Sequence, residues 1–407
     1  MSGDVIGMSA SERDRSHLVR RIVAGELKQV RAAELLGITP RQVGRLVAAY
    51  RARGDRGLVS GKRGKASNNR RGEAERQRIV AALKARYADF GPTLAAEKLA
   101  EHEGIAVSRE SVRQLQIAHG LWRPKARKAK RVFQVRERRG RFGELIQIDG
   151  SHHDWFEGRA PRCALLVFID DATGRLTGLR FAPSETAHGY LELLRAHVLA
   201  HGLPLALYSD RHGIFRVNAK DVEAGDGKTA FNRATERLGI AQICASTPQA
   251  KGRVERANQT LQDRLVRELR LAAISDMAAA QAFLPAFMAR FNAKFAVRPR
   301  LADDAHRPWD KGAGALDATL AAHDERTLSK ALTFSTGGAK YCVNTGPTAG
   351  IALRGSKVTV RHYLDGRMDV VFKDRLLSVT RVRGLPRVSE VADDKTLDAR
   401  VDALVAA

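Results

Sequence analysis

Between residues 143 and 184 the sequence holds three short apolar runs, each closed by turn residues. The runs are GELIQIDGS, CALLVFIDDATG and LTGLRFAPS. Runs of this length, rich in branched and aromatic residues and bounded by Gly, Asp, Ser or Pro, predict β-strands. Because each run ends in turn residues, we expect three successive antiparallel strands.

Helices and strands alternate after the third run. The segment AHGYLELLRAHVLAHG predicts a helix, and PLALYSDRHG predicts a fourth strand. After an irregular stretch come a helix, GKTAFNRATERLG, and a fifth strand, IAQICAS, which leads into the helix of STPQAKGRVERANQTLQDRLVRELR. This order predicts a mixed five-stranded sheet covered by helices.

The length and charge of the chain restrict its class. At 407 residues it is too long for one compact core, so we expect a multidomain α+β protein of two to four domains. The formal net charge of +25 favours a polyanionic partner, chiefly nucleic acid, with an anionic membrane as the rival. No apolar run approaches the roughly 18 residues of a spanning helix, and the N-terminus lacks a signal-peptide core. We therefore expect a cytoplasmic protein.

Residues 1–57 have the pattern of a helix-turn-helix DNA-binding domain. Gly37-Ile38-Thr39 interrupts the apolar periodicity, with Thr39 placed to cap a third helix and Pro40 at its first position. The second helix of such a motif enters the major groove. This makes Arg41, Gln42 and Arg45 candidate base or phosphate contacts. The alternative is a three-helix bundle with a solvated basic face.

Residues 70–121 repeat this pattern less sharply and predict a second helix-turn-helix domain. A helix from Glu73 to Tyr87 precedes two more, for which Thr93 and Ser108 are the expected N-caps. Arg109 and Arg113 are expected to face outward as DNA contacts. Two modules on one tether would bind DNA more tightly together than singly.

The segment 122–140, WRPKARKAKRVFQVRERRG, is a basic linker with nine Lys and Arg residues and one Glu. Such a run binds phosphates with an affinity that falls steeply with salt. The expected phosphate contacts are Arg127, Lys128, Lys130 and Arg131. The alternative is a solvated linker.

Three acidic motifs carry a family resemblance: LIQIDGSHHDWF, LYSDRHGIF and STPQAKGRVERANQTLQDRL. They resemble the motifs of the DDE transposase and retroviral integrase superfamily. With the predicted helix-turn-helix domains, the chain from about residue 10 to 385 is similar to bacterial insertion-sequence transposases, particularly the ISNCY group. The resemblance implies a ribonuclease H-like catalytic core over 141–312, a nucleoid-associated location and a homo-oligomer, dimer or larger, on double-stranded DNA.

The same resemblance implies that Asp149, Asp210 and Glu255 are catalytic carboxylates that bind two Mg²⁺ or Mn²⁺ ions. The chemistry agrees, because phosphoryl transfer needs charge neutralisation and an activated oxygen nucleophile, and hard cations take oxygen ligands. Near the helix start, Lys251 and Arg253 would bind the DNA phosphates. The gap between Asp210 and Glu255 is longer than the roughly 35 residues usual in the superfamily. This difference concerns the conformation of the intervening loop more than the site.

Each carboxylate also has a structural interpretation. Glu255 near a helix N-terminus is favourable by about 0.3 to 1 kcal/mol without any chemistry. Asp149 and Asp210 could be ordinary turn residues at strand ends. The neighbouring pair Asp170-Asp171, followed by Gly174, is expected to form the hairpin turn between the second and third strands.

The last third predicts helices and then a small β-barrel over 325–385, followed by a tail over 386–407. A buried apolar stripe is expected in the helical part, comprising Leu284, Phe287, Met288 and Phe291. Alternation of period two with the hairpin signal LDGR predicts the barrel, with basic outer positions at Arg354, Lys357 and Arg361. Three widely spaced cysteines predict buried free thiols, and the histidine spacing does not favour zinc.

Two functions follow from these observations. The first is a DNA transposase that binds the terminal inverted repeats of its insertion sequence and catalyses metal-dependent strand cleavage and strand transfer. The second is a catalytically inactive DNA-binding regulator or target-capture protein on the same fold. The presence of Asp149, Asp210 and Glu255 together favours the first.

Overall fold

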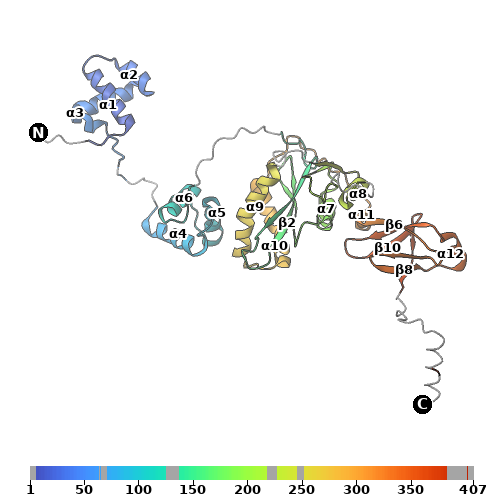
Figure 1. Cartoon of the computed structure of the whole chain (residues 1–407). Helices are drawn as coiled ribbons and strands as arrows, with labels where there is room; N and C mark the ends of the chain where they lie inside the picture. Colours follow the sequence, from blue (N-terminus) through green and yellow to red (C-terminus); the bar gives the residue numbers. More distant parts are fainter. Residues whose placement is uncertain are drawn as a thin grey trace. The chain divides into compact units, whose positions relative to one another are not determined.

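The computed structural model describes residues 6–63, 65, 71–124, 137–217, 227–244, 252–382 and 401. The chain divides into two compact units, residues 1–125 and 126–407. Figure 1 shows the course of the chain through both units. The central part of the basic linker, Lys251 and nearly all of the predicted tail lie outside the described residues.

The first unit begins with three helices and a short 3₁₀ turn, as the sequence predicts. Their bounds are Ala10–Val23 (α1), Gln29–Leu36 (α2), Pro40–Arg53 (α3) and Gly54–Leu58 (η1). Gly37 ends α2 in the left-handed region at φ 61°, which favours glycine. Thr39 caps α3 by accepting a hydrogen bond from the Gln42 N–H, and Pro40 takes the first helical position. The turn chemistry is therefore as predicted.

Glu12 connects α1 to the residues that follow η1. Its buried carboxylate accepts hydrogen bonds from the backbone N–H of Ser60 and of Ser9, both at 2.8 Å, and pairs with Arg63. The Ser60 and Ser9 N–H groups stabilise the charged form, and with Arg63 they lower the pKa of Glu12 from 4.5 to about 2. Glu12 thus links residues far apart in sequence.

We expect the three-helix group to lose stability in acid because of Glu12. A carboxylate with a lowered folded pKa stabilises the fold above pH 4.5, and this stability is lost as the pH falls toward about 2. Glu12→Gln should flatten this pH dependence, whereas Glu34→Gln on the surface of α2 should keep the wild-type profile. The measurement is the hydrogen-exchange protection of residues 10–23 between pH 6 and pH 3. Equal profiles for wild type and Glu12→Gln would contradict the prediction.

Three more helices complete the described part of the first unit: Glu73–Arg86 (α4), Pro92–Glu103 (α5) and Arg109–Ala118 (α6). Ser108 caps α6 by accepting from the Ser111 N–H at 3.1 Å, as predicted. The prediction for Thr93 is wrong, because α5 begins two residues earlier than an N-cap at Thr93 requires, at Pro92, and Gly91 occupies the N-cap position. Proline at the first helical position determines this start, since its fixed φ suits the helix and its missing N–H needs no partner.

The second unit contains the five-stranded mixed sheet that the sequence predicts, in the order β3-β2-β1-β4-β5. The strands are Ile146–His153 (β1), Cys163–Asp170 (β2), Leu176–Ala182 (β3), Ala206–Ser209 (β4) and Ala241–Cys244 (β5). The first three strands pair antiparallel, whereas β4 runs parallel to both β1 and β5. The Asp170-Asp171 pair begins the turn between β2 and β3, as predicted, with Gly174 donating its N–H to the Asp170 carbonyl.

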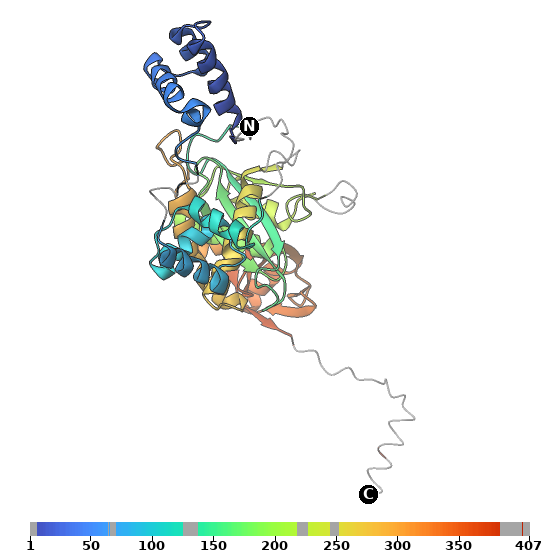
Figure 2. The same cartoon turned by 90° about the vertical axis from the view of Figure 1, so that its left-hand side faces the viewer.

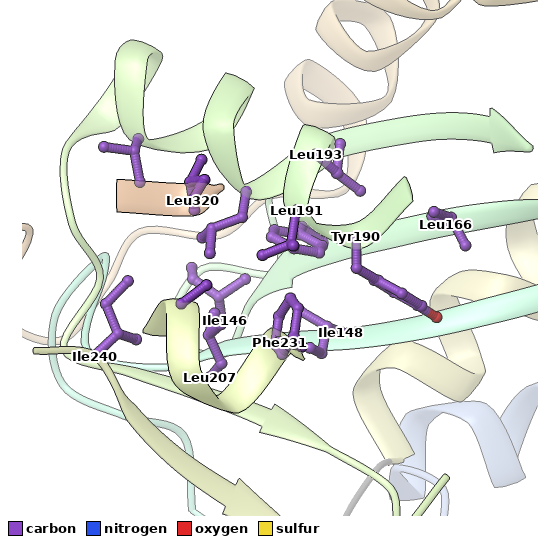
Figure 3. Packing of buried hydrophobic residues seen from close by; sticks show 14 of the residues in the cluster. Ile146, Ile148, Leu166, Tyr190, Leu191, Leu193, Leu207, Phe231, Ile240 and Leu320 are labelled. Carbon is purple, nitrogen blue, oxygen red and sulfur yellow. The ribbon is translucent and has the colours of Figure 1, made fainter. Parts of the chain in front are cut away.

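Helices cover both faces of the sheet (Figure 1). One face packs against Ala187–His201 (α7), Ala230–Arg237 (α8) and Gly312–Leu320 (α11). Figure 3 shows this cluster, in which Ile146 and Ile148 of β1 meet Leu191, Phe231 and Leu320 from the helices. Helix α11 thus contributes to the core although the sequence predicts the end of this domain at residue 312.

The other face packs against Gly252–Leu271 (α9) and Met277–Phe295 (α10). The predicted stripe of α10 is confirmed, because Leu284, Phe287 and Phe291 are buried and Met288 is partly buried against them. Alternate residues of β1 point to this second face, which places Gln147, Asp149 and Ser151 beneath α9.

The strands after residue 321 do not form the predicted small β-barrel. They form a four-stranded sheet, β11-β10-β9-β6, and a three-stranded sheet, β12-β8-β7 (Figures 1 and 2, orange to red). The strands are Ala322–Thr327 (β6), Thr333–Thr336 (β7), Ala339–Val343 (β8), Lys357–His362 (β9), Met368–Phe372 (β10), Arg375–Leu377 (β11) and Val379–Arg381 (β12). Within the described residues no strand pairing joins the two sheets, and the consecutive strands β11 and β12 belong to different ones.

A helix that the sequence analysis missed, Pro347–Leu353 (α12), lies between β8 and β9 and adds Leu353 to the core of these sheets. The hairpin predicted at LDGR is confirmed as β9 and β10. All three cysteines are free, but only Cys163 is buried, and Cys244 and Cys342 are half-buried. No described helix has the length and hydrophobicity needed to cross a bilayer.

Candidate active site at the ends of the central strands

Asp149 and Asp210 lie at the same level of two neighbouring strands. In the parallel register of β1 and β4, Ile146 faces Leu207 and Gln147 faces Tyr208. Continuing this register by two residues brings Asp149 beside Asp210, the residue directly after β4. Both carboxylates are half-buried, and Asp149 is a mid-strand residue because β1 continues to His153, whereas Asp210 directly follows β4.

A polar seam joins β1 to α9. Gln147 Oε1 accepts from the Val254 N–H at 3.1 Å, Asp149 Oδ2 accepts from Asn258 Nδ2 at 2.8 Å, and Gln262 Nε2 donates to Ser151 Oγ at 3.0 Å. Two residues of a strand span nearly the same length as four residues of a helix. Every second residue of β1 can therefore bond to every fourth residue of α9. We call these three contacts the β1–α9 seam.

Glu255 lies on the first described turn of α9, between the first two contacts of the seam, and its side chain is exposed. Asn258 is one turn further along the helix and already contacts Asp149, so residue 255 is on the neighbouring part of the same surface. Among the described residues, however, no group of three or more His, Cys, Asp or Glu side chains is arranged to hold a metal ion. The carboxylate oxygens fit a hard divalent cation in their chemistry, but the three side chains are not gathered around one point.

A fourth carboxylate, Glu185, was not identified from the sequence. Its Oε2 accepts from the Tyr190 hydroxyl at 2.9 Å, and its Oε1 lies 3.2 Å from His152 Nε2. The carboxylate rests on Gly150, where a Cβ atom would come within 2.0 Å of the Glu185 Cδ. Gly150 therefore leaves the space that Glu185 occupies.

The pKa of Tyr190 is shifted by burial and by the nearby carboxylates. Figure 3 shows its ring packed in the apolar cluster. Burial raises the pKa of Tyr190 far above its ordinary value, and the nearby negative charges of Glu185, Asp149 and Asp210 raise it further. One hydroxyl thus lies within electrostatic reach of three carboxylates that come from distant segments.

Asp171 is fully buried, and its carboxylate binds three segments. Oδ1 accepts from Gln147 Nε2 at 2.7 Å and from Arg253 Nη1 at 2.8 Å, and Oδ2 accepts from the Arg139 N–H at 2.9 Å. Arg253 is therefore turned toward the protein interior, with a side chain that is 19% exposed. This position differs from the outward one expected for a phosphate contact, because the buried charge of Asp171 attracts the guanidinium.

Comparisons with known proteins identify the family. The chain is 46% identical over 375 residues to "Putative transposase y4bF" of Sinorhizobium fredii, covering 92% of this chain and 81% of the relative. It is also 30% identical over 340 residues to the transposase for insertion sequence IS1202 of Streptococcus pneumoniae, covering 74% of this chain and 72% of that protein. The chain belongs to the insertion-sequence transposases. No family model matches the transposase.

Solved structures that are similar to the transposase include retroviral integrases. The HTLV-2 integrase catalytic core in complex with magnesium aligns with a TM-score of 0.28 and 18% identity, covering 35% of this chain and 84% of that one. The simian T-cell lymphotropic virus intasome in complex with a PP2A regulatory subunit aligns with a TM-score of 0.33 and 14% identity, covering 74% of this chain and 97% of that one.

The predicted DNA-contacting residues of the transposase are in part exposed. Arg41, Gln42 and Arg45 are exposed on α3, although Gln42 Oε1 also accepts from the Thr39 N–H at 2.9 Å. On α6, Arg109 is exposed, whereas Arg113 forms two hydrogen bonds with Glu110. The remaining predicted contacts lie outside the described residues: Arg127, Lys128, Lys130, Arg131 and Lys251.

A histidine cluster in the transposase was also missed. His197 and His201 lie one turn apart on α7, and His306 Nε2 is 3.1 Å from His197 Nε2. Burial, with the neighbouring His306 and His201, lowers the pKa of His197 to about 3, so this imidazole is neutral at physiological pH. The cluster packs α7 against the segment around residue 306 and, within the described chain, is not arranged to bind a metal.

Proposed function

We propose that the transposase cleaves and joins DNA with Asp149, Asp210 and Glu255 as its catalytic carboxylates. The observation that carries the proposal is the meeting of two strands and one helix: Asp149 lies within β1, Asp210 directly follows the neighbouring parallel strand β4, and the β1–α9 seam holds the helix that bears Glu255 against β1. Oxygen ligands from three separate elements are suited to Mg²⁺ or Mn²⁺.

In this proposal Asp149, Asp210 and Glu255 would hold two divalent cations, which would supply Lewis acidity and an activated oxygen nucleophile. Asn258 orients Asp149 through its hydrogen bond to Oδ2. The exposed Glu255 side chain would have to turn toward Asp149 and Asp210 to share a cation with them, and its backbone lies between two contacts of the seam. In the strand-transfer step the freed 3′-hydroxyl of the transposon end would attack a phosphodiester of the target DNA, forming the new P–O bond and displacing the 3′-oxygen of the target strand.

The N-terminal helices would recognise the terminal inverted repeats as two helix-turn-helix modules, with α3 and α6 in the major groove. The basic linker would add sequence-independent phosphate contacts, in keeping with the net charge of +25. Coordinated cutting of two transposon ends calls for a dimer or larger assembly on DNA. The C-terminal strands, with exposed Arg354 and Lys357, would provide an accessory DNA or subunit contact.

Arg41→Ala combined with Arg45→Ala is expected to weaken binding to repeat-end DNA. If both side chains contact phosphates, the slope of log K against log salt should fall by about 2. Arg51→Ala removes an exposed charge further along α3, on a different face of the helix, and should leave the slope unchanged. Fluorescence anisotropy across a salt series measures both. An unaltered slope in the double variant would remove α3 from the DNA interface.

Repeat-end DNA cleavage tests the proposed function. Labelled repeat-end duplex is incubated with the transposase and Mg²⁺ or Mn²⁺, and the strands are separated on a denaturing gel. We expect metal-dependent nicks at the transposon end, and joining products when target DNA is added. A regulator without catalytic activity would retard the same duplex in a native gel and leave every strand whole.

A further inference from the structure

We propose that Asp171 is a positioning residue of the transposase: it fixes the first turn of α9 against β1, and thereby fixes Glu255 relative to Asp149. The proposal rests on the proposed function, because the role of Asp171 is defined by the role of Glu255. Asp171 itself lies in the turn after β2 and belongs to none of the three acidic motifs.

The carboxylate of Asp171 acts through two side chains. Gln147 donates its Nε2 to Asp171, which directs Gln147 Oε1 to the N–H of Val254. Arg253, the residue before Val254, donates Nη1 to the same Asp171 oxygen. Two consecutive residues of α9 are therefore held by one buried carboxylate, one through an ion pair and one through the Gln147 amide.

These contacts determine the position of the Glu255 backbone. The Glu255 backbone follows the residue held by Gln147 and precedes by three residues Asn258, which is bonded to Asp149. The seam contact at Asn258 holds the second turn of α9, and the Asp171 contacts hold the first turn. Without Asp171, the Gln147 amide and the Arg253 guanidinium lose this shared acceptor, so Gln147 is no longer oriented by it toward the Val254 N–H.

The turn between β2 and β3 does not depend on Asp171. Its neighbour Asp170 shapes that turn, since Asp170 Oδ2 accepts from the Thr173 N–H at 2.7 Å and from the Thr173 hydroxyl at 2.6 Å. Asp170 Oδ1 accepts from the Gly143 N–H at 3.0 Å. The two adjacent aspartates thus have separate roles: Asp170 bonds to Thr173 within the turn, and Asp171 bonds to Arg253 of α9.

Asp171→Asn in the full-length transposase tests the proposal. Asparagine keeps the size and one acceptor oxygen but loses the charge that pairs with Arg253. A displacement of about 1 Å at a reacting group can lower a rate by about 100-fold. We expect the maximal cleavage rate to fall about 10- to 100-fold and the Mg²⁺ concentration for half-maximal rate to rise. The DNA concentration for half-maximal rate should stay within about twofold, since Asp171 is buried away from DNA.

The matched control is Glu268→Gln, which breaks another ion pair of α9, the one with Arg290 at 2.7 Å, far from Glu255. It should leave the Mg²⁺ requirement at the wild-type value. Arg253→Gln provides a second route if Asp171→Asn does not fold, and should raise the Mg²⁺ requirement in the same direction. Because both residues belong to one contact, the double variant should be no slower than the slower single variant.

The outcomes separate this proposal from the proposed function. If the wild type does not cleave, or if Glu255→Gln cleaves as well as the wild type, the proposed function fails. If the wild type cleaves and Glu255→Gln does not, wild-type rate and Mg²⁺ dependence in Asp171→Asn would overturn the positioning role. A loss of DNA affinity in Asp171→Asn with an unchanged maximal rate would overturn it as well.

Discussion

Glu255→Gln is expected to abolish strand cleavage by the transposase while leaving DNA binding intact. The substitution keeps the length of the side chain and removes its charge, and a neutral amide is a poor ligand for a hard cation. Loss of a metal contact in the transition state costs several kcal/mol, and about 4 kcal/mol corresponds to about 1,000-fold in rate. Cleavage of labelled repeat-end DNA in Mg²⁺ measures the rate, and a native gel measures binding.

The control for this prediction is Glu268→Gln on the same helix. Glu268 pairs with Arg290 near the other end of α9, so its loss tests whether any missing carboxylate on this helix slows cleavage. We expect wild-type cleavage by this variant. Equal rates for the wild type and Glu255→Gln would remove Glu255 from the catalytic site, whatever the result for Glu268.

Trp155→Ala is expected to cost about 3 to 5 kcal/mol in the free energy of unfolding. Trp155 follows β1 and is fully buried in the core beneath α9 and α10, where its ring centroid lies 5.9 Å from that of Phe181. Its Nε1 donates to the Ser151 carbonyl at 3.1 Å. Alanine would leave a large cavity and would remove the hydrogen bond to the Ser151 carbonyl. Urea unfolding of the full chain, followed by circular dichroism, gives the change.

Trp309→Ala is the matched substitution. Trp309 is only partly buried against the opposite core, and its Nε1 donates to the Gly312 carbonyl at 2.8 Å. We expect a clearly smaller loss of stability than for Trp155→Ala, because less apolar surface leaves the core. The reverse order of the two losses would show that the cluster around Trp155 is not the main stabilising core.

The elements of the central sheet were predictable because each strand is short, apolar and closed by turn residues, and each helix keeps one apolar face. The C-terminal part was less predictable. Its alternating pattern indicates strands but does not state which strands pair, so two sheets were mistaken for one barrel. Helix α12 has a local signal, Gly346 at the N-cap and Pro347 at the first position, which the surrounding alternation obscured.

The candidate site was predictable only in its motif residues. Asp149, Asp210 and Glu255 stand in recognisable motifs, whereas Asp171 bonds to partners 24 and 82 residues away that no local pattern connects. The residues next to Asp171 in the sequence predict only a turn. Glu185 was missed for a similar reason, since the space it fills depends on the absence of a side chain at Gly150.

The β1–α9 seam limits how the protein can vary in length. A strand advances by about 6.6 Å in two residues and a helix by about 6 Å in four, so the two repeats stay matched only over a few steps. One residue added between Val254 and Asn258 would rotate everything beyond it by about 100°. Outside Glu255 and the residues of the seam, this part of α9 can therefore tolerate a change of residue type far better than an insertion or a deletion.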